Sequence, residues 1–176
     1  MRGVNGLAVS ESDLMSDSNQ SVTLRPSAPS DQDFLFAVYA STRQDELSLS
    51  AWDEKQKLAF VEMQFNAQNQ QYRMSYPEAE TNLILIDQRP IGRMIVDDGD
   101  QLTLVDIALL PEYRGQGIGS RLIAALLEKA SATGKPVSLH VLRYNRAVQL
   151  YSRLGFSIIG EDEMYFRMKW TPPSGP

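Results

Sequence analysis

The hydrophobic positions of this chain follow two periods, one typical of helices and one typical of strands. Apolar residues three and four positions apart predict amphipathic helices over residues 31–42, 52–69, 117–133 and 145–154. Alternating or continuous apolar runs predict strands over residues 21–25, 81–86, 91–96, 101–109, 137–142, 156–160 and 164–170. With no repeat and no internal linker, this order predicts one mixed α/β (α+β) domain. We expect a mostly antiparallel sheet of about six to seven strands flanked by about four helices.

Individual residues refine the expected helices. Ser30 and Asp33 have the spacing of a capping box at the start of the first helix. In the second helix, Leu58, Val61 and Phe65 are expected to form the buried stripe, and the glutamine-rich stretch 67–71 to be a frayed end. The stripe expected for the third helix consists of Ile118, Leu122, Ala125 and Leu126.

Neither end of the chain shows a hydrophobic period. Residues 1–20 are small and polar, which predicts a flexible lead-in, and Met15 is an alternative to Met1 as the native start. Residues 171–176 are rich in proline and glycine and are expected to be a tail. The folded domain is therefore expected over residues 21–170.

Composition excludes several kinds of chemistry. The chain has 176 residues with no cysteine and one histidine, which leaves no disulfide, no thiolate nucleophile and no basis for a metal site. No apolar run approaches the length of a membrane-spanning helix, so we expect no membrane partner. The lack of cysteine is compatible with a reducing compartment, and a cytoplasmic location is expected.

Charge is distributed unevenly along the chain. The net charge is −5, which argues against a nucleic-acid partner. Acidic residues outnumber basic ones in residues 1–110, and the balance reverses in residues 111–176. The C-terminal part is therefore suited to an anionic ligand, and the N-terminal part suggests a cationic one.

A glycine-rich segment, residues 109–120, lies between an expected strand and an expected helix. Glycines let the backbone approach a ligand closely, and a helix N-terminus offers free N–H groups, so the segment predicts a phosphate site. A nucleotide P-loop needs a lysine after its last glycine, whereas Gly119 is followed by Ser120 and Arg121. The dinucleotide fingerprint needs a glycine where Ser120 stands and a parallel βαβ unit.

The segment Arg114-x-x-Gly117-x-Gly119 resembles the acyl-CoA-binding motif of the GCN5-related N-acetyltransferase (GNAT) superfamily. A second resemblance follows at the family's spacing, carried by Asn145, Ala147, Leu150, Tyr151, Leu154, Gly155 and Phe156. The resemblance covers roughly residues 81–170. It implies an N-acetyltransferase that uses acetyl-CoA as acyl donor, without a metal.

The resemblance also implies a cofactor cleft. A bulge in the strand before the glycines is expected to open a gap, in which backbone groups of Ile107, Ala108 and Leu109 meet the pantetheine and the thioester. The pyrophosphate is expected on the backbone of Arg114, Gly115, Gln116, Gly117, Ile118, Gly119 and Ser120, with Arg114 adding charge. Asn145 is expected to contact the pantetheine arm, and Arg146 and Arg153 either reach the adenosine phosphates or are solvated.

In this family an amine attacks the thioester directly, in a ternary complex. The resemblance makes Tyr151 the expected general acid. Asp106 is a candidate general base unless it faces away from the cleft, in which case it is structural, and His140 is another candidate.

The acceptor is expected to be a primary amine of a small molecule or peptide. Candidate acceptor residues are Tyr39, Arg43, Glu46, Tyr76 and His140. The acidic N-terminal half suggests a cationic amine. The alternative function is a catalytically inactive acyl-CoA sensor, and a homodimer could form through residues 164–170.

Overall fold

Seven strands form one sheet in the computed structural model, which describes residues 21–173. The strands are β1 (Val22–Pro26), β2 (Glu80–Ile86), β3 (Arg89–Asp98), β4 (Leu102–Leu109), β5 (Val137–Leu142), β6 (Ser157–Glu161) and β7 (Tyr165–Trp170). Their spatial order is β1-β2-β3-β4-β5-β7-β6. Among these neighbours, β4 and β5 run parallel and every other pair is antiparallel. The expected mixed, mostly antiparallel sheet is confirmed. The expected lead-in lies outside the described residues.

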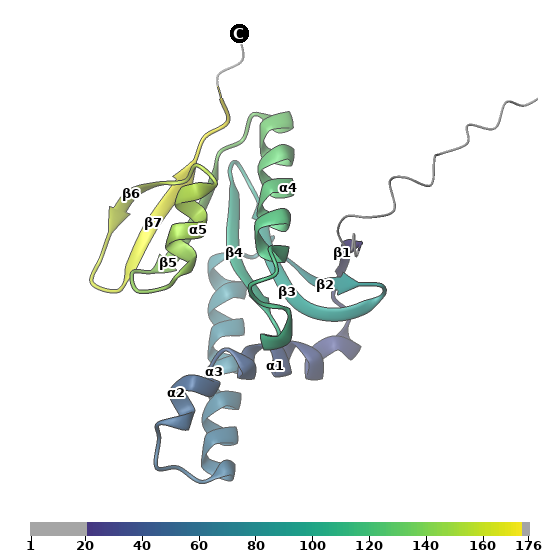
Figure 1. The fold of residues 1–176 in the computed structure, drawn as a ribbon, viewed down its shortest axis with the longest axis vertical. Coiled ribbons are helices and arrows are strands. Elements are labelled where there is room, and N and C mark those ends of the chain that lie inside the picture. The colour runs from purple at the N-terminus through teal and green to yellow at the C-terminus, as the bar shows by residue number, and fades with distance from the viewer. Residues whose placement is uncertain (1–20, 174–176) are drawn as a thin grey trace, which may run out of the picture.

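Two layers of helices cover this sheet. The helices within residues 21–173 are α1 (Gln32–Ser41), α2 (Gln44–Ser48), α3 (Glu54–Ser75), α4 (Ile118–Thr133) and α5 (Ala147–Arg153). In Figure 1, α4 and α5 lie in front of the sheet, and α1 and α3 lie behind it. No helix in this part of the chain has both the length and the apolar composition needed to cross a membrane.

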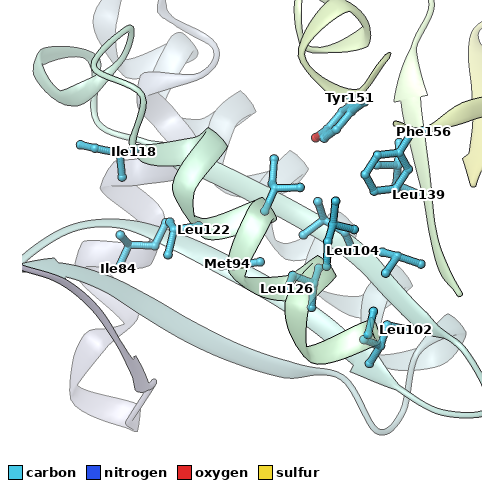
Figure 2. Packing of buried hydrophobic residues seen from close by; sticks show 14 of the residues in the cluster. Ile84, Met94, Leu102, Leu104, Ile118, Leu122, Leu126, Leu139, Tyr151 and Phe156 are labelled. Carbon is cyan, nitrogen blue, oxygen red and sulfur yellow. The ribbon is translucent and has the colours of Figure 1, made fainter. Parts of the chain in front are cut away.

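Each face of the sheet has its own hydrophobic core. Side chains alternate along a strand, so Ile84 and Ile86 of β2 enter the core beneath α4, and Leu83 and Leu85 enter the core against α1 and α3. The α4 core is the larger, and Figure 2 shows its side chains between α4, α5 and the sheet.

A β-bulge interrupts β4. Ile95 of β3 pairs with Asp106, and the next residue, Val96, pairs with Leu104, so Val105 is left without a partner on β3. An extra residue of this kind bends a strand and increases its twist. The bulge that the family resemblance implied is confirmed.

The parallel pair β4–β5 is hydrogen-bonded over only part of its length. Residues Leu102–Leu104 pair with Val137–Leu139, although β4 continues to Leu109 and β5 to Leu142. The two strands therefore separate from the bulge onward, and a wedge opens between them. This opening was also expected from the resemblance.

Two expectations about the first helices are wrong. The Ser30–Asp33 capping box does not form, because a 3₁₀ turn at Pro29–Asp31 precedes α1 and Asp31 accepts a hydrogen bond from the Ala28 N–H at 2.7 Å. The connection expected to be a loop contains α2, which starts one turn after α1 ends.

The second expected helix is longer than the sequence predicted. It ends at Ser75, because Tyr72 and Tyr76 beyond the glutamine-rich stretch are partly buried. Leu58 is 51% exposed rather than buried, since the first turns of α3 extend beyond the sheet (Figure 1). In α4, Ala125 is exposed and Ile123 is fully buried.

Residues 164–170, the segment considered for a homodimer, are paired within the sheet of the chain itself. Strand β7 lies between β5 and β6 and is hydrogen-bonded on both sides. The hairpin folds back on β5, which leaves β6 and β1 as the edges of the sheet.

Candidate functional site

The glycine turn, residues 114–119, connects β4 to α4. A 3₁₀ turn at Pro111–Tyr113 reverses the chain after β4, and Gly115 and Gly117 then adopt left-handed φ angles of 73° and 76°. Side-chain-bearing residues rarely adopt such angles, so glycine is required at both positions by the backbone itself. Because Gly117 is the N-cap of a 16-residue helix, the free amides and the positive dipole end face the turn.

Gly119 is not explained by backbone strain. Its φ is not left-handed, and a Cβ placed there would meet nothing within 4 Å. The same open space surrounds Gly115 and Gly117. The protein's own packing therefore does not require a glycine at residue 119, and the surface of the first turn of α4 is open at this position. An open helix end of this kind is what the expected pyrophosphate site requires.

The Arg114 side chain is directed away from the first turn of α4. Its Nε donates to the Leu109 carbonyl at 2.8 Å, and its Nη2 donates to Ser41 Oγ at 3.0 Å. These bonds tie the glycine turn to the end of α1. In this arrangement Arg114 orients the turn, and its guanidinium does not extend into the space beside Gly119.

The start of α5 lies on the other side of the wedge. Asn145 Oδ1 accepts a hydrogen bond from the Ala147 N–H at 2.9 Å, so its carbonyl oxygen holds the first turn of α5 and its amide donors remain available. Arg146 and Arg153 are exposed. Arg146 is the N-cap of α5 and Arg153 is its last residue, and their exposure is compatible with both expected alternatives, contact with the adenosine phosphates or solvation.

Tyr151 enters the large core from α5 and is 7% exposed. Its ring packs edge-on against Phe156 at 5.7 Å between centroids, and Figure 2 shows the hydroxyl pointing away from Phe156. Burial, with a smaller contribution from the Asp106 charge, raises the pKa of Tyr151 to about 12. The phenol is therefore protonated at neutral pH and is a weaker acid than an exposed tyrosine.

Asp106 is engaged in a buried ion pair. Arg93 of β3 is 2% exposed, and its Nε donates to Asp106 Oδ2 at 2.7 Å. A second guanidinium nitrogen donates to Gln68 Oε1 of α3 at 2.8 Å, and the guanidinium also lies 5.8 Å from the centre of the Tyr39 ring. Asp106 therefore faces α1 and α3, beside the bulge, and is held by Arg93.

Sequence reasoning did not identify Arg93. The available signal was a lone arginine within the apolar run Ile91–Val96, where strand alternation directs its side chain toward a core. A charge at such a position needs a partner, because a buried unpaired charge is costly. Asp106 lies thirteen residues away in sequence, and only the pairing of β3 with β4 brings the two together.

A cavity of about 360 Å³, the β4–β5 cavity, lies where these two strands separate. Its walls come from α3, β4, β5 and β7, with Tyr76 and His140 among them. Tyr72 also lines it, and burial together with the Asp106 charge raises the pKa of Tyr72 above its usual range. The remaining lining residues are Gln68, Gln71, Ser75, Leu104, Val105 and Tyr165.

A second cavity of about 200 Å³ lies on the other side of α3, toward β1–β3. Tyr72, Tyr76 and Arg93 are among its walls. Tyr72 and Tyr76 therefore separate two spaces on the same face of the sheet. Neither has an aspartate or glutamate among the side chains that line it.

Three predicted acceptor residues lie outside both cavities. Tyr39 is 2% exposed and belongs to the smaller core, where Arg43 Nε donates to its hydroxyl at 3.3 Å. Arg43 also pairs with Glu46 at 3.4 Å. These contacts join α1 to α2 and account for all three side chains. Of the predicted acceptor residues, the structure brings Tyr76 and His140 together.

The model of the acetyltransferase (GNAT) family matches residues 29–156 of this chain. The chain is also similar to thialysine N-epsilon-acetyltransferases. It is 45% identical to the Bos taurus protein over 67 residues, and 38% identical to the Mus musculus protein over 74 residues. The first of these alignments covers 37% of this chain and 39% of the relative, so the chain spans about two fifths of the length of that relative.

Solved structures show the same fold. A PaiA N-acetyltransferase from Thermoplasma acidophilum, in complex with coenzyme A, superposes with a TM-score of 0.65 at 19% identity, covering 86% of this chain and 99% of that one. A spermidine N-acetyltransferase from Vibrio cholerae, in complex with CoA and spermine, gives 0.60 at 20% identity, covering 87% and 96%.

Proposed function

Because this chain belongs to the acetyltransferase (GNAT) family, we propose that it transfers an acetyl group from acetyl-CoA to a primary amine of a small molecule or peptide. The observation that carries the proposal is the open space at Gly119 in the first turn of α4. The glycine turn connects this helix end to β4, the strand that separates from β5. A phosphate-binding helix end and a wedge for an extended pantetheine arm are thus adjacent.

The backbone of this chain would bind the donor. N–H groups of the glycine turn hold the pyrophosphate, and the separated part of β4, Ile107–Leu109, offers its free backbone groups to the pantetheine. Asn145, Arg146 and Arg153 approach from α5. An N–H of β4 aimed at the thioester oxygen would stabilise the negative charge that develops there.

Acetyl-CoA, when bound, supplies an activated acyl group. The acyl carbon exchanges its bond to sulfur for a bond to the acceptor nitrogen, and one proton passes from the amine to the departing thiolate. Tyr151 relays this proton: its phenol gives a proton to the thiolate and takes up the proton that the acceptor nitrogen loses. The acceptor amine must first lose its own extra proton. His140 lines the cavity beside the wedge and accepts that proton, while Asp106 is held by Arg93.

The test is titration of acetyl-CoA into the purified protein and into the Gly119→Glu variant. A carboxylate at residue 119 would occupy the open space and repel the pyrophosphate, without the left-handed strain that a change at Gly117 would add. We expect affinity to fall by about a hundredfold, on the order of 2.7 kcal/mol. Ala125→Glu is the matched control, because it adds the same charge to an exposed position of the same helix.

Release of free thiol during turnover distinguishes an enzyme from an acyl-CoA sensor. A folded protein that binds acetyl-CoA but releases no thiol with any primary amine would contradict the proposed activity. Equal binding by wild type and Gly119→Glu would contradict the proposed donor site.

A further inference from the structure

The C-terminal half of β4, residues 106–109, is paired along one edge with β3, where Ile95 lies opposite Asp106. The pairing of β4 with β5 ends at Leu104, so the other edge of this half-strand is not paired with β5. A half-strand held on one side has more freedom to tilt than one held on both. In the proposed function its backbone meets the pantetheine and the thioester, so its angle affects the reaction.

Arg93 of β3 fastens this half-strand through its side chain. It lies opposite Ala108, and its Nε donates diagonally across the two strands to Asp106 Oδ2 at 2.7 Å. Diagonal neighbours on paired strands are about 7–8 Å apart, which is within reach of a long side chain. Asp106 directly follows Val105, the bulged residue. The hydrogen bond therefore acts where the half-strand leaves the bulge, at the end nearest the point where β5 separates.

The same guanidinium links β4 to the helices behind it. Its Nη2 donates to Gln68 Oε1 of α3 at 2.8 Å, and it lies 5.8 Å from the centre of the Tyr39 ring of α1. Because a guanidinium is planar and its donors point in fixed directions, both hydrogen bonds form together only within a narrow range of orientations of β4 relative to α3. Gln68 also lines the β4–β5 cavity. Arg93 therefore fixes the half-strand against a helix that forms one of the walls of this cavity.

Arg93 is not placed to contact the reactants. It is buried, with 2% of the residue exposed, and it is not among the residues that line the β4–β5 cavity. Tyr151 belongs to the core on the α4–α5 face, whereas Arg93 lies on the α1–α3 face with Tyr39 and Gln68. Any effect of Arg93 on acetyl transfer must therefore pass through the position of β4 or through the charge of Asp106.

We propose that Arg93 is a positioning residue for acetyl transfer, because it holds residues 106–109 at the angle at which their backbone meets the thioester. This role rests on the proposed acetyltransferase function. A displacement of about 1 Å can cost about a hundredfold in rate, even when the substituted residue is distant from the chemistry. The pyrophosphate is assigned to the glycine turn, at the other end of the pantetheine from the thioester. Loss of Arg93 should therefore lower kcat more than the affinity for acetyl-CoA.

The experiment compares Arg93→Met with Arg93→Lys, at a temperature at which circular dichroism shows both variants folded. Arg93→Met should lower kcat, measured by thiol release, by about tenfold or more, and lower the affinity for acetyl-CoA by less than about threefold. Arg93→Lys keeps a positive charge beside Asp106 but has no planar fork to join Asp106 to Gln68. Its kcat should lie between those of Arg93→Met and wild type. An unchanged kcat in Arg93→Met, or full kcat in Arg93→Lys, would overturn the positioning role.

Leu85→Ala is the matched control for lost stability. Leu85 is 6% exposed and belongs to the same smaller core as Tyr39, and it lies on β2, which is not a neighbour of β4 in the sheet. Truncating it destabilises the fold by leaving space in that core, without removing a contact to β4. Its kcat should stay at the wild-type value in folded protein. An equal fall of kcat in Leu85→Ala and Arg93→Met would assign the effect to stability and overturn the proposal.

Amide hydrogen exchange, measured by mass spectrometry, tests the same contact without catalysis. In Arg93→Met, the exchange rate of residues 106–109 should rise by about tenfold more than that of β2, because local opening follows the loss of local contacts. In Leu85→Ala the larger rise should occur in β2. Unchanged exchange of residues 106–109 in Arg93→Met would overturn the proposal. If the wild type releases no thiol with any primary amine, the proposed function fails, and the exchange result still decides whether Arg93 holds this part of β4.

Discussion

The two faces of the sheet build their parts of the site by different means. On the α4–α5 face, the glycine turn and the first turn of α4 present backbone groups, and they come from one continuous segment of chain. On the α1–α3 face, the β4–β5 cavity and the Arg93–Asp106 pair are assembled from side chains of α3, β3, β4, β5 and β7. A site made of local backbone has a sequence motif, and a site made of distant side chains has none.

The difference also concerns charge. The α4–α5 face offers a helix dipole and exposed arginines to an anion. On the α1–α3 face, Arg93 and Asp106 form a buried ion pair, and no aspartate or glutamate lines the β4–β5 cavity. Substitutions on the α4–α5 face should act mainly by filling the space beside the helix end or by straining the backbone. Substitutions on the α1–α3 face should act mainly by leaving a charge without its partner.

The largest effect is expected from Arg93→Met. The change leaves Asp106 without its ion-pair partner and Gln68 without its donor, in a largely buried place. Breaking a buried pair costs about 3 to 5 kcal/mol, and the lower end applies because the Asp106 side chain is 21% exposed. Urea unfolding monitored by circular dichroism measures the loss.

Two further variants give this measurement its controls. Lys57→Ala removes an exposed pair with Glu54 and should leave the unfolding midpoint nearly unchanged. Removing both members, Arg93→Met with Asp106→Leu, should recover part of the stability, because no charge remains buried. If Arg93→Met were as mild as Lys57→Ala, which is on the same side of the sheet, substitutions on the α1–α3 face would not act mainly through unpaired charge.

The next effect concerns Tyr151 on the α4–α5 face. Tyr151→Phe keeps the packing against Phe156 but removes the proton donor, so kcat should fall by about a hundredfold. The measurement is the rate of thiol release at saturating acetyl-CoA. An unchanged kcat would exclude Tyr151 as the acid and leave the hydroxyl without a catalytic role.

The pH dependence of Tyr151 has a definite sign. Burial raises its pKa from an ordinary value of 10.0 to about 12, so the phenol remains protonated between pH 10 and 12. The acid form needed for catalysis is therefore present up to pH 10, and Tyr151 should cause no loss of rate there. The stability that comes from burying the neutral phenol is complete below pH 10 and lost as the pH rises toward 12. Absorbance of the ionised phenol, compared between wild type and Tyr151→Phe, locates the transition.

The smallest of these losses is expected from Gly92→Ala. Gly92 lies in β3 and pairs with Leu109, on the part of β4 that separates from β5. A Cβ at residue 92 would collide with the Ala108 carbonyl oxygen and lie 2.8 Å from Leu109 Cδ2, on the separated part of β4. Moving that strand should cost about 1 to 3 kcal/mol and weaken acetyl-CoA binding. Gly99→Ala is the control, because its Cβ would come no closer than 3.5 Å to other atoms. Thermal unfolding and acetyl-CoA titration of both variants test the difference.

Particular residues show how far sequence reasoning reached. The third helix was predicted to end at residue 133, and Gly134 ends α4 there with a left-handed φ of 68°, because the requirement is set by the local backbone. Leu58 was predicted to be buried from its spacing, but helical spacing does not reveal where a helix extends beyond its sheet. The roles proposed for Tyr151, His140 and the donor-binding residues remain predictions.

Tyr39 and Glu46 illustrate the same limit within the site. Both are polar residues in the expected position for acceptor recognition, yet their contacts are with Arg43 and the smaller core. Whether such a side chain faces a cavity depends on how α1, α2 and α3 pack on the sheet. No pattern within one helix carries that information.

The sequence by itself determined the order of the strands and of every described helix except α2, the family resemblance, and the glycine turn before α4, since each depends on residues close together in the chain. Only the tertiary structure decided that Arg93 pairs with Asp106, that Val105 is the bulged residue, and which side chains line the cavity between β4 and β5. The physical reason is that backbone geometry is fixed by near neighbours, whereas the burial and pairing of a charge depend on side chains brought together from distant parts of the chain.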